Sequence, residues 1–209
     1  MSLTPNAIPP APAENEICNA ARESSETLAL LARRRSTKIA HMGDPGPDAA
    51  QLDALMRLAA RVPDHGKLGP WRFVIIEGDG RARAGEAIAN VIANDPGVDD
   101  ARLSFARGLF ERAPVCVMVV SSPVPSPKIP EWEQIQSASA ACLALLLAAH
   151  AMGFAGCWLT EWIAYDARTR AALGLTEKEQ IAGLIYLGTA KEPATERVRA
   201  DVKARVSRF

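Results

Sequence analysis

The sequence has no net charge and few aromatic residues. Its 209 residues include 24 lysines and arginines against 24 aspartates and glutamates, and only 5% are aromatic. Proteins that bind nucleic acid usually carry a basic excess, and disordered chains usually carry a large net charge, so both classes are disfavoured. Hydrophobic residues make up 48% of the chain, an ordinary value for a globular protein. This length is enough for one domain with a substantial core.

The sequence also lacks paired cysteines and long apolar runs. None of the four cysteines has CxxC spacing or a histidine at ligand spacing, which argues against a disulfide framework and against a metal site. Cys116, Cys142 and Cys157 lie in apolar runs and are predicted to be small buried side chains. The N-terminus does not resemble a secretory signal, and the longest apolar run, residues 140–149, is too short to cross a bilayer. We therefore expect a cytoplasmic protein with no membrane or nucleic-acid partner.

Helical and strand patterns alternate along the chain. Residues 1–22 form a leader rich in proline and alanine that is predicted to be flexible, and residues 23–209 are expected to form a single domain. Asp48 is predicted to cap one of the helices, with Gln51 completing a capping box. The order of elements predicts an α/β or α+β layered domain. Helices are predicted from residue 25 to the arginines at 33–35, and at about 48–59, 81–94, 98–112, 133–152 and just after 166; strands are predicted at 73–76, 115–120, 156–160 and 181–187.

Several common catalytic motifs are absent. There is no G-x-S-x-G nucleophile elbow, and the Gly66-Lys67 pair lacks the flanking residues of a phosphate-binding P-loop. Residues 78–80, Gly-Asp-Gly, follow a predicted strand and precede a predicted helix, as a dinucleotide-binding turn would. However, Arg83 stands where close packing of helix on sheet requires a third glycine. A nicotinamide-binding Rossmann enzyme without flavin is therefore a weak alternative.

Three segments carry residues that suit a cofactor site, and each has a structural alternative. Residues 33–36, Arg-Arg-Arg-Ser, could grip a phosphate, or could simply place cations at a helix C-terminus. Residues 61–71 combine charge, proline and glycine, either as a surface connection or as part of a site. Residues 157–162 add a hydroxyl and a carboxylate to a tryptophan-rich strand end, which suits either a core or the rim of a pocket.

In this order, the three segments resemble those of the nitroreductase family of FMN enzymes, and within it the short YdjA-like branch. The resemblance covers about residues 25–190 and includes two further matches, at residues 132–134 and 186–189. It implies an α+β sandwich, with a central mixed sheet flanked by helices, built as an intertwined homodimer. The small residues of the long helix suit its expected place at the dimer core.

The resemblance also implies one FMN per subunit at the dimer interface. Residues matching those that hold the phosphate and ribityl chain are Arg34, Arg35 and Ser36. Residues matching those that meet the flavin from the partner subunit are Arg61 and His65. Residues matching the segment along the isoalloxazine are Trp158, Leu159 and Thr160.

The implied function is that of an NAD(P)H oxidoreductase. A reduced nicotinamide would pass a hydride to flavin N5, and a nitro compound, quinone or similar small molecule would then accept the electrons by ping-pong turnover. No side chain need act as nucleophile or general base, so no catalytic residue is assigned. Arg61 or Lys67 is expected to place a cation near flavin N1 and O2. Because Lys67 and Gly69 depart from the loop of better-known members, a flavin-binding or storage protein with little turnover is the alternative.

Overall fold

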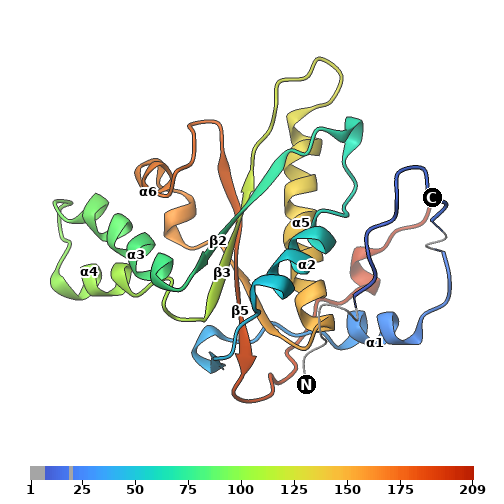
Figure 1. Cartoon of the computed structure of the whole chain (residues 1–209), viewed down its shortest axis with the longest axis horizontal. Helices are drawn as coiled ribbons and strands as arrows, with labels where there is room; N and C mark the ends of the chain where they lie inside the picture. Colours follow the sequence, from blue (N-terminus) through green and yellow to red (C-terminus); the bar gives the residue numbers. More distant parts are fainter. Residues whose placement is uncertain (1–7, 19–20) are drawn as a thin grey trace.

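A five-stranded sheet forms the centre of the protein. The computed structural model describes residues 8–18 and 21–209, and its strands follow the order β1-β5-β3-β2, with β4 also pairing with β5 (Figure 1). The strands are β1 Met42–Gly43, β2 Trp71–Glu77, β3 Val115–Ser121, β4 Ala155–Leu159 and β5 Gln180–Ala190. The α-helices are α1 Ser25–Arg33, α2 Ala49–Ala59, α3 Asp79–Ile92, α4 Asp100–Arg107, α5 Glu131–Ala151 and α6 Ala167–Ala172. The described residues also include short 3-10 helices, η2 Ile39–His41, η3 His65–Lys67, η4 Trp162–Ala164 and η5 Lys203–Arg205.

The direction of the strands differs from the mixed sheet that the resemblance implied. Every strand pair in the described chain is antiparallel. Between β2 and β3, helices α3 and α4 pack on each other as a hairpin, so the chain returns to the C-terminal end of β2. The first residue of β3, Val115, therefore pairs with the last residue of β2, Glu77, and the two strands are antiparallel. The Gly-Asp-Gly turn at residues 78–80 therefore opens an antiparallel connection, whereas a dinucleotide-binding turn requires a parallel one.

The sheet separates two hydrophobic cores. Along β3 the side chains alternate: Cys116 and Met118 face the core beneath α3 and α4, while Val117 and Val119 face the core beneath α2 and α5. Figure 1 shows the same division, with α3, α4 and α6 on one side of the strands and α2 and α5 on the other. Because both faces are covered, all of β3 is buried, which explains its continuous apolar sequence.

Two predicted helix boundaries are confirmed. The Asp48 carboxylate accepts a hydrogen bond from Gln51 N at 2.8 Å, and the Gln51 side chain accepts one from Asp48 N at 2.9 Å. This capping box starts α2 at the predicted residue. The helix predicted to end at residue 152 is α5, which ends at Ala151 and is followed by Gly153 with a positive φ of 86°.

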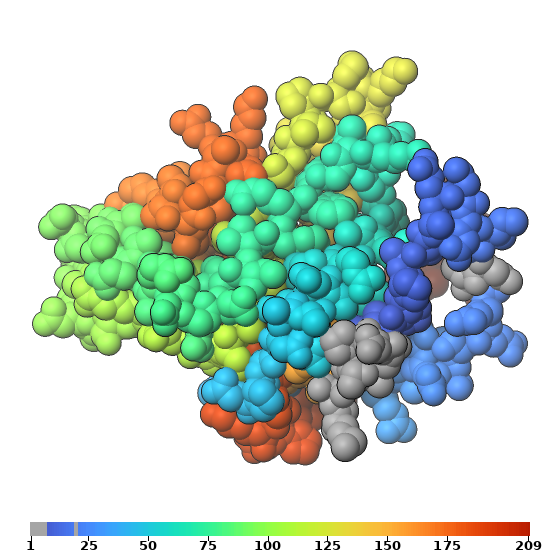
Figure 2. Space-filling view, viewed as in Figure 1, coloured from blue at the N-terminus to red at the C-terminus, as the bar shows by residue number. Residues whose placement is uncertain are grey.

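Part of the proline-rich leader packs on the fold. Residues 8–18 contain no helix or strand, and Ile8 packs against the core beside α2. Figure 2 shows this N-terminal segment, in blue, against the side of the molecule opposite α3 and α4. Residues 1–7 and 19–20 of the predicted leader lie outside the described residues.

Helix α5 is long and apolar enough to cross a membrane by length and composition. Half of that stretch is nevertheless buried inside the fold, where α5 packs against α1, α2 and four strands of the sheet, β2, β3, β4 and β5. The core helix of a globular domain passes the same test, and the packing of α5 is that of a core helix.

A buried ion pair braces the edge of the sheet. Glu179 is 6% exposed, and its two oxygens accept hydrogen bonds from Arg72 of β2 at 2.7 and 2.9 Å. Ser122 Oγ also donates to it at 3.0 Å, and Thr176 N at 2.9 Å. These bonds, with that from Arg72 foremost, lower the pKa of Glu179 to about 2.

We predict that Glu179→Gln lowers the free energy of unfolding at pH 7 by about 1–3 kcal/mol, since hydrogen bonds to a buried charge are lost. The lowered pKa means that the contribution is present above the unfolded carboxyl value of about 4.5 and is lost as the pH falls toward 2. Denaturant melts should therefore show the difference between wild type and variant shrinking from pH 5 to pH 2.5.

The matched control is Glu86→Gln, which removes the exposed ion pair with Arg107 and should cost less than about 1 kcal/mol. A wild-type advantage over Glu179→Gln that stays constant between pH 5 and pH 2.5 would contradict the assignment.

Candidate functional site

The chain that follows α1 is tied to the beginning of β4. Thr37 N donates to the carbonyl of Gly156 at 3.1 Å, so residues 33–36, here called the arginine-serine segment, lie beside β4. There Arg34 Nη2 donates to Ser36 Oγ at 3.3 Å, while Arg34 Nε is buried and has no partner among the described residues. This guanidinium therefore retains a buried donor for which the described protein supplies no acceptor.

His150, near the end of α5, lies beside the same segment. Both of its ring nitrogens are buried beside the backbone of Gly156, and neither makes a hydrogen bond of ordinary geometry with the described residues. Burial lowers the pKa of His150, and the nearby positive charge of Arg34 lowers it further. The imidazole is therefore held neutral next to Arg34.

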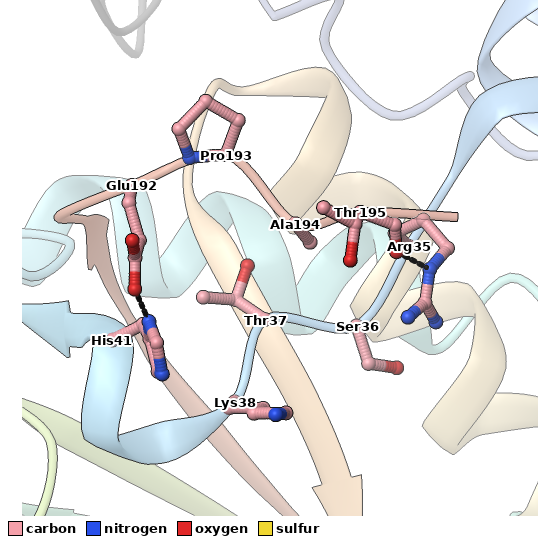
Figure 3. Close-up of a pocket in the computed structure, with 9 residues that line it drawn as sticks. All are labelled: Arg35, Ser36, Thr37, Lys38, His41, Glu192, Pro193, Ala194 and Thr195. Carbon is pink, nitrogen blue, oxygen red and sulfur yellow. Dashed lines mark hydrogen bonds and ion pairs between the residues drawn. The ribbon is translucent and has the colours of Figure 1, made fainter. Parts of the chain in front are cut away.

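The next residues line a cavity of about 260 Å³ that the C-terminal segment closes (Figure 3). Arg35 Nε donates to the carbonyl of Thr195 at 2.8 Å and lies 3.6 Å from the carboxylate of Glu196, while His41 pairs with Glu192. In Figure 3, the backbone from residue 35 to 38 runs past residues 192–195, which come from the end of β5. Residues 35–38, His41 and residues 192–195 line this cavity, so Ser36 shares it with the cations of Arg35 and Lys38 and with the carboxylate of Glu192.

Two basic residues of the C-terminal segment, Lys191 and Arg199, make contacts within or beside it. Lys191 donates its backbone N–H to the carbonyl of His41 at 2.9 Å, and Arg199 Nε lies 3.1 Å from the carboxylate of Glu196. The sequence did not point to residues 192–196 as neighbours of the arginine cluster, because no local pattern connects segments that are 160 residues apart.

Trp158 is fixed by a bulge in β5. The register between β3 and β5 shifts between Val119 and Val120, which leaves Ala182 as an extra residue, and its carbonyl accepts from Trp158 Nε1 at 3.2 Å. The indole lies over Gly183, where an added Cβ would stand 2.3 Å from Nε1. An isolated glycine inside a strand pattern is a sequence signal for such a close approach.

The residues after Trp158 form an open hollow. Trp158, Leu159, Thr160 and Glu161 line a shallow pocket of about 450 Å³. Thr160 Oγ1 lies 3.1 Å from the hydroxyl of the exposed Tyr165. A flat ligand could contact this strand end from solvent.

The loop between α2 and β2 is held against the other end of α5. Asp64 accepts from Leu68 N at 3.1 Å and from Gly69 N at 2.8 Å, which fixes the loop on itself. His65 Nδ1 lies 2.7 Å from a carboxylate oxygen of Glu133, in the first turn of α5.

A second bond fastens the loop one turn further along α5. Ser137 Oγ donates to the carbonyl of Pro63 at 2.8 Å and accepts from Trp71 Nε1 at 3.2 Å. Arg61, at the start of the loop, lines a small cavity together with the leader residues 9–12.

Within one chain, the predicted site residues fall into two groups at opposite ends of α5. His65 lies by Glu133 and Arg34 lies by His150, and these two helix positions are about 25 Å apart along the axis. By contrast, the arginine-serine segment lies at the beginning of β4 and residues 158–160 lie at its end. The distance along the strand from Gly156 to Thr160 is about 13 Å. The described residues show no cluster of three or more metal-ligating side chains.

The antiparallel sheet covered on both faces, with polar segments at both ends of β4, defines an α+β fold of the nitroreductase type. A family model described as "Nitroreductase family" matches residues 31–189. The chain therefore belongs to the nitroreductase family and is an oxidoreductase, as the sequence resemblance predicted.

Known proteins agree in sequence and in structure. The "Putative NAD(P)H nitroreductase YdjA" of Escherichia coli (strain K12) is 37% identical over 170 residues, which cover 81% of this chain and 91% of that protein. A nitroreductase-like family protein from Bacillus cereus superposes with a TM-score of 0.77 at 20% identity, over 91% of this chain and 99% of that one. A nitroreductase with bound FMN from Bacteroides fragilis gives a TM-score of 0.65 at 22% identity, over 89% and 100% of the two chains. These two structures are similar to this chain in fold.

We predict that Gly183→Ala displaces the Trp158 indole, because the new methyl group would meet Nε1 at 2.3 Å. Overpacking of this kind costs about 1–3 kcal/mol. Denaturant melts and tryptophan fluorescence should both change. Gly108→Ala is the control, since its methyl group would come no nearer than 3.6 Å to any neighbour. Equal effects of the two substitutions would show that Gly183 has no special role.

Proposed function

We propose that this protein is an FMN-dependent NAD(P)H oxidoreductase that works as a homodimer, with one FMN per subunit at the interface. The observation that carries the proposal is the separation of the candidate residues at the two ends of α5. One chain offers the arginine-serine segment and residues 158–160 along β4, while Arg61 and His65 of the same chain lie on a loop held at the far end of the helix. A second subunit can supply the residues that one chain cannot bring together.

The donors at the beginning of β4 fit a phosphate. Arg34 has a buried Nε without a partner, and Arg35 and Ser36 add a guanidinium and a hydroxyl within the same short segment. Guanidinium groups bind phosphate oxygens through paired, charge-assisted hydrogen bonds. We assign the FMN phosphate and the adjoining ribityl chain to these three residues.

The other end of β4 fits a flat ring. Trp158 is locked against β5, and Leu159 and Thr160 continue along the open hollow. A ligand with a phosphate at one end and a planar ring at the other can contact both ends of this one strand. We therefore place the isoalloxazine along Trp158, Leu159 and Thr160.

Exposed apolar side chains support a second subunit. Leu28 and Leu31 of α1 are 67% and 52% exposed, and Leu143 of α5 is 44% exposed. Helices α1 and α5 also pack on each other. Apolar surface of this kind, on neighbouring helices, marks protein–protein contacts.

When bound, FMN supplies the redox chemistry, taking a hydride at N5 from a reduced nicotinamide and passing electrons to a nitro compound, quinone or similar acceptor in ping-pong turnover. The side chains position and balance charge. Arg61 and His65 of the partner subunit would approach the ring edge, with the His65 imidazole oriented by Glu133. A cation from Arg61 or Lys67 would stabilise negative charge at flavin N1 and O2.

Mixing two defective subunits tests the shared site. We predict that the double variant Arg34→Ala/Ser36→Ala and the double variant Arg61→Ala/His65→Ala each bind FMN poorly alone. When the two proteins are unfolded and refolded together, the mixed dimer holds one site with every wild-type residue, so about a quarter of the wild-type FMN capacity should return.

Capacity is measured from the flavin absorbance that remains with the protein after gel filtration. Wild-type protein carried through the same refolding is the control. A mixture that binds no more FMN than either variant alone would contradict a site shared between subunits.

A separate experiment tests the cation. Arg61→Ala and Lys67→Ala are each expected to be well folded, because both side chains are on a surface loop. We predict that at least one of them lowers the reduction potential of the bound flavin, since the reduced anion loses a stabilising charge. Spectroelectrochemical titration measures this potential. An unchanged potential in both variants would remove these two residues from the flavin site.

A further inference from the structure

The residue that ends the flavin-facing segment has an unusual backbone conformation. Glu161, directly after Thr160, has φ 57° and ψ 175°, values that suit glycine better than a residue with a Cβ. Holding such a conformation costs about 1–3 kcal/mol and requires support from the surroundings.

The support comes from a buried network. The Glu161 carboxylate, in a side chain 15% exposed, forms an ion pair with Arg112 Nη2. The same nitrogen donates to the hydroxyl of Tyr186 at 3.0 Å, and Arg112 Nε donates to the carbonyl of Leu109 at 2.8 Å. The Tyr186 hydroxyl in turn donates to Leu109 O at 3.2 Å.

This network joins three separate parts of the fold. Tyr186 is completely buried in β5, opposite Cys157 of β4, and burial raises the pKa of its hydroxyl. Arg112 comes from the turn between α4 and β3. Glu161 is thus fastened both to the centre of the sheet and to the turn after α4, at the point where the chain leaves the hollow lined by residues 158–161.

We propose that the Arg112–Glu161 pair holds residues 158–160 in position against the flavin, and that its two side chains neutralise each other's charge next to these residues. This inference rests on the proposed function, since it needs a flavin along these residues. Two consequences follow from the geometry. Loss of either partner frees the segment, and it leaves one unpaired charge whose sign depends on which partner is removed.

The test compares Glu161→Gln with Arg112→Met in the FMN-loaded protein. Both variants are expected to raise the dissociation constant for FMN about tenfold or more, because both release the segment. Their reduction potentials should shift in opposite directions: up for Glu161→Gln, which leaves the Arg112 cation, and down for Arg112→Met, which leaves a carboxylate. The double variant should weaken FMN binding by less than the product of the two single effects, because the pair acts as a unit.

Two further variants separate positioning from stability. Glu161→Gly accepts the positive φ without a Cβ and should fold well, yet it should still bind FMN more weakly and raise the potential. Glu179→Gln is the matched control: it alters a different buried pair of arginine and carboxylate, and it should lower stability without moving the dissociation constant or the potential.

The proposal is overturned if Glu161→Gly and Glu161→Gln bind FMN like wild type with an unchanged potential. It is also overturned if the potentials of Glu161→Gln and Arg112→Met shift in the same direction, as a general loss of packing would produce. Wild-type protein that takes up no FMN would instead refute the proposed function, and this inference with it. Binding by wild type is therefore measured first.

Discussion

The length of α5 is the constraint on which the proposed site depends. This helix of 21 residues lies across one face of the sheet, with His65 held at its first turn and Arg34 beside its last turn. A continuous helix cannot fold back to bring its ends together, so the two groups stay about 25 Å apart in one chain. The exposed leucines on α1 and α5 provide a surface through which a second copy could bring the missing group.

Strand β4 and its neighbour β5 set the finer geometry. The bulge at Ala182 frees a carbonyl for the indole of Trp158, and the absence of a side chain at Gly183 makes room for the ring. Three residues after Trp158, just beyond the end of β4, the Arg112–Glu161 pair fixes the backbone. The ring end of the proposed site therefore depends on contacts made by residues far from it in the sequence.

Much of the fold could be predicted because its signals are local. The apolar run of β3 and the capping box of α2 were both confirmed. The mixed sheet was wrong because strand direction is set by the α3–α4 hairpin, a tertiary feature that periodicity does not reveal. The segments of the candidate site stand out as short motifs, whereas the C-terminal residues over Arg35 and the partner of Glu161 come from distant parts of the chain and leave no local pattern.

The central claim is that the flavin site exists only where two subunits meet. The most direct test is sedimentation velocity of the FMN-loaded protein over a dilution series. The sedimenting species are detected both by the visible absorbance of flavin and by the absorbance of the protein. The account predicts that bound flavin sediments only with the dimer and is released as the dimer dissociates. Flavin that sediments with a monomer would contradict it.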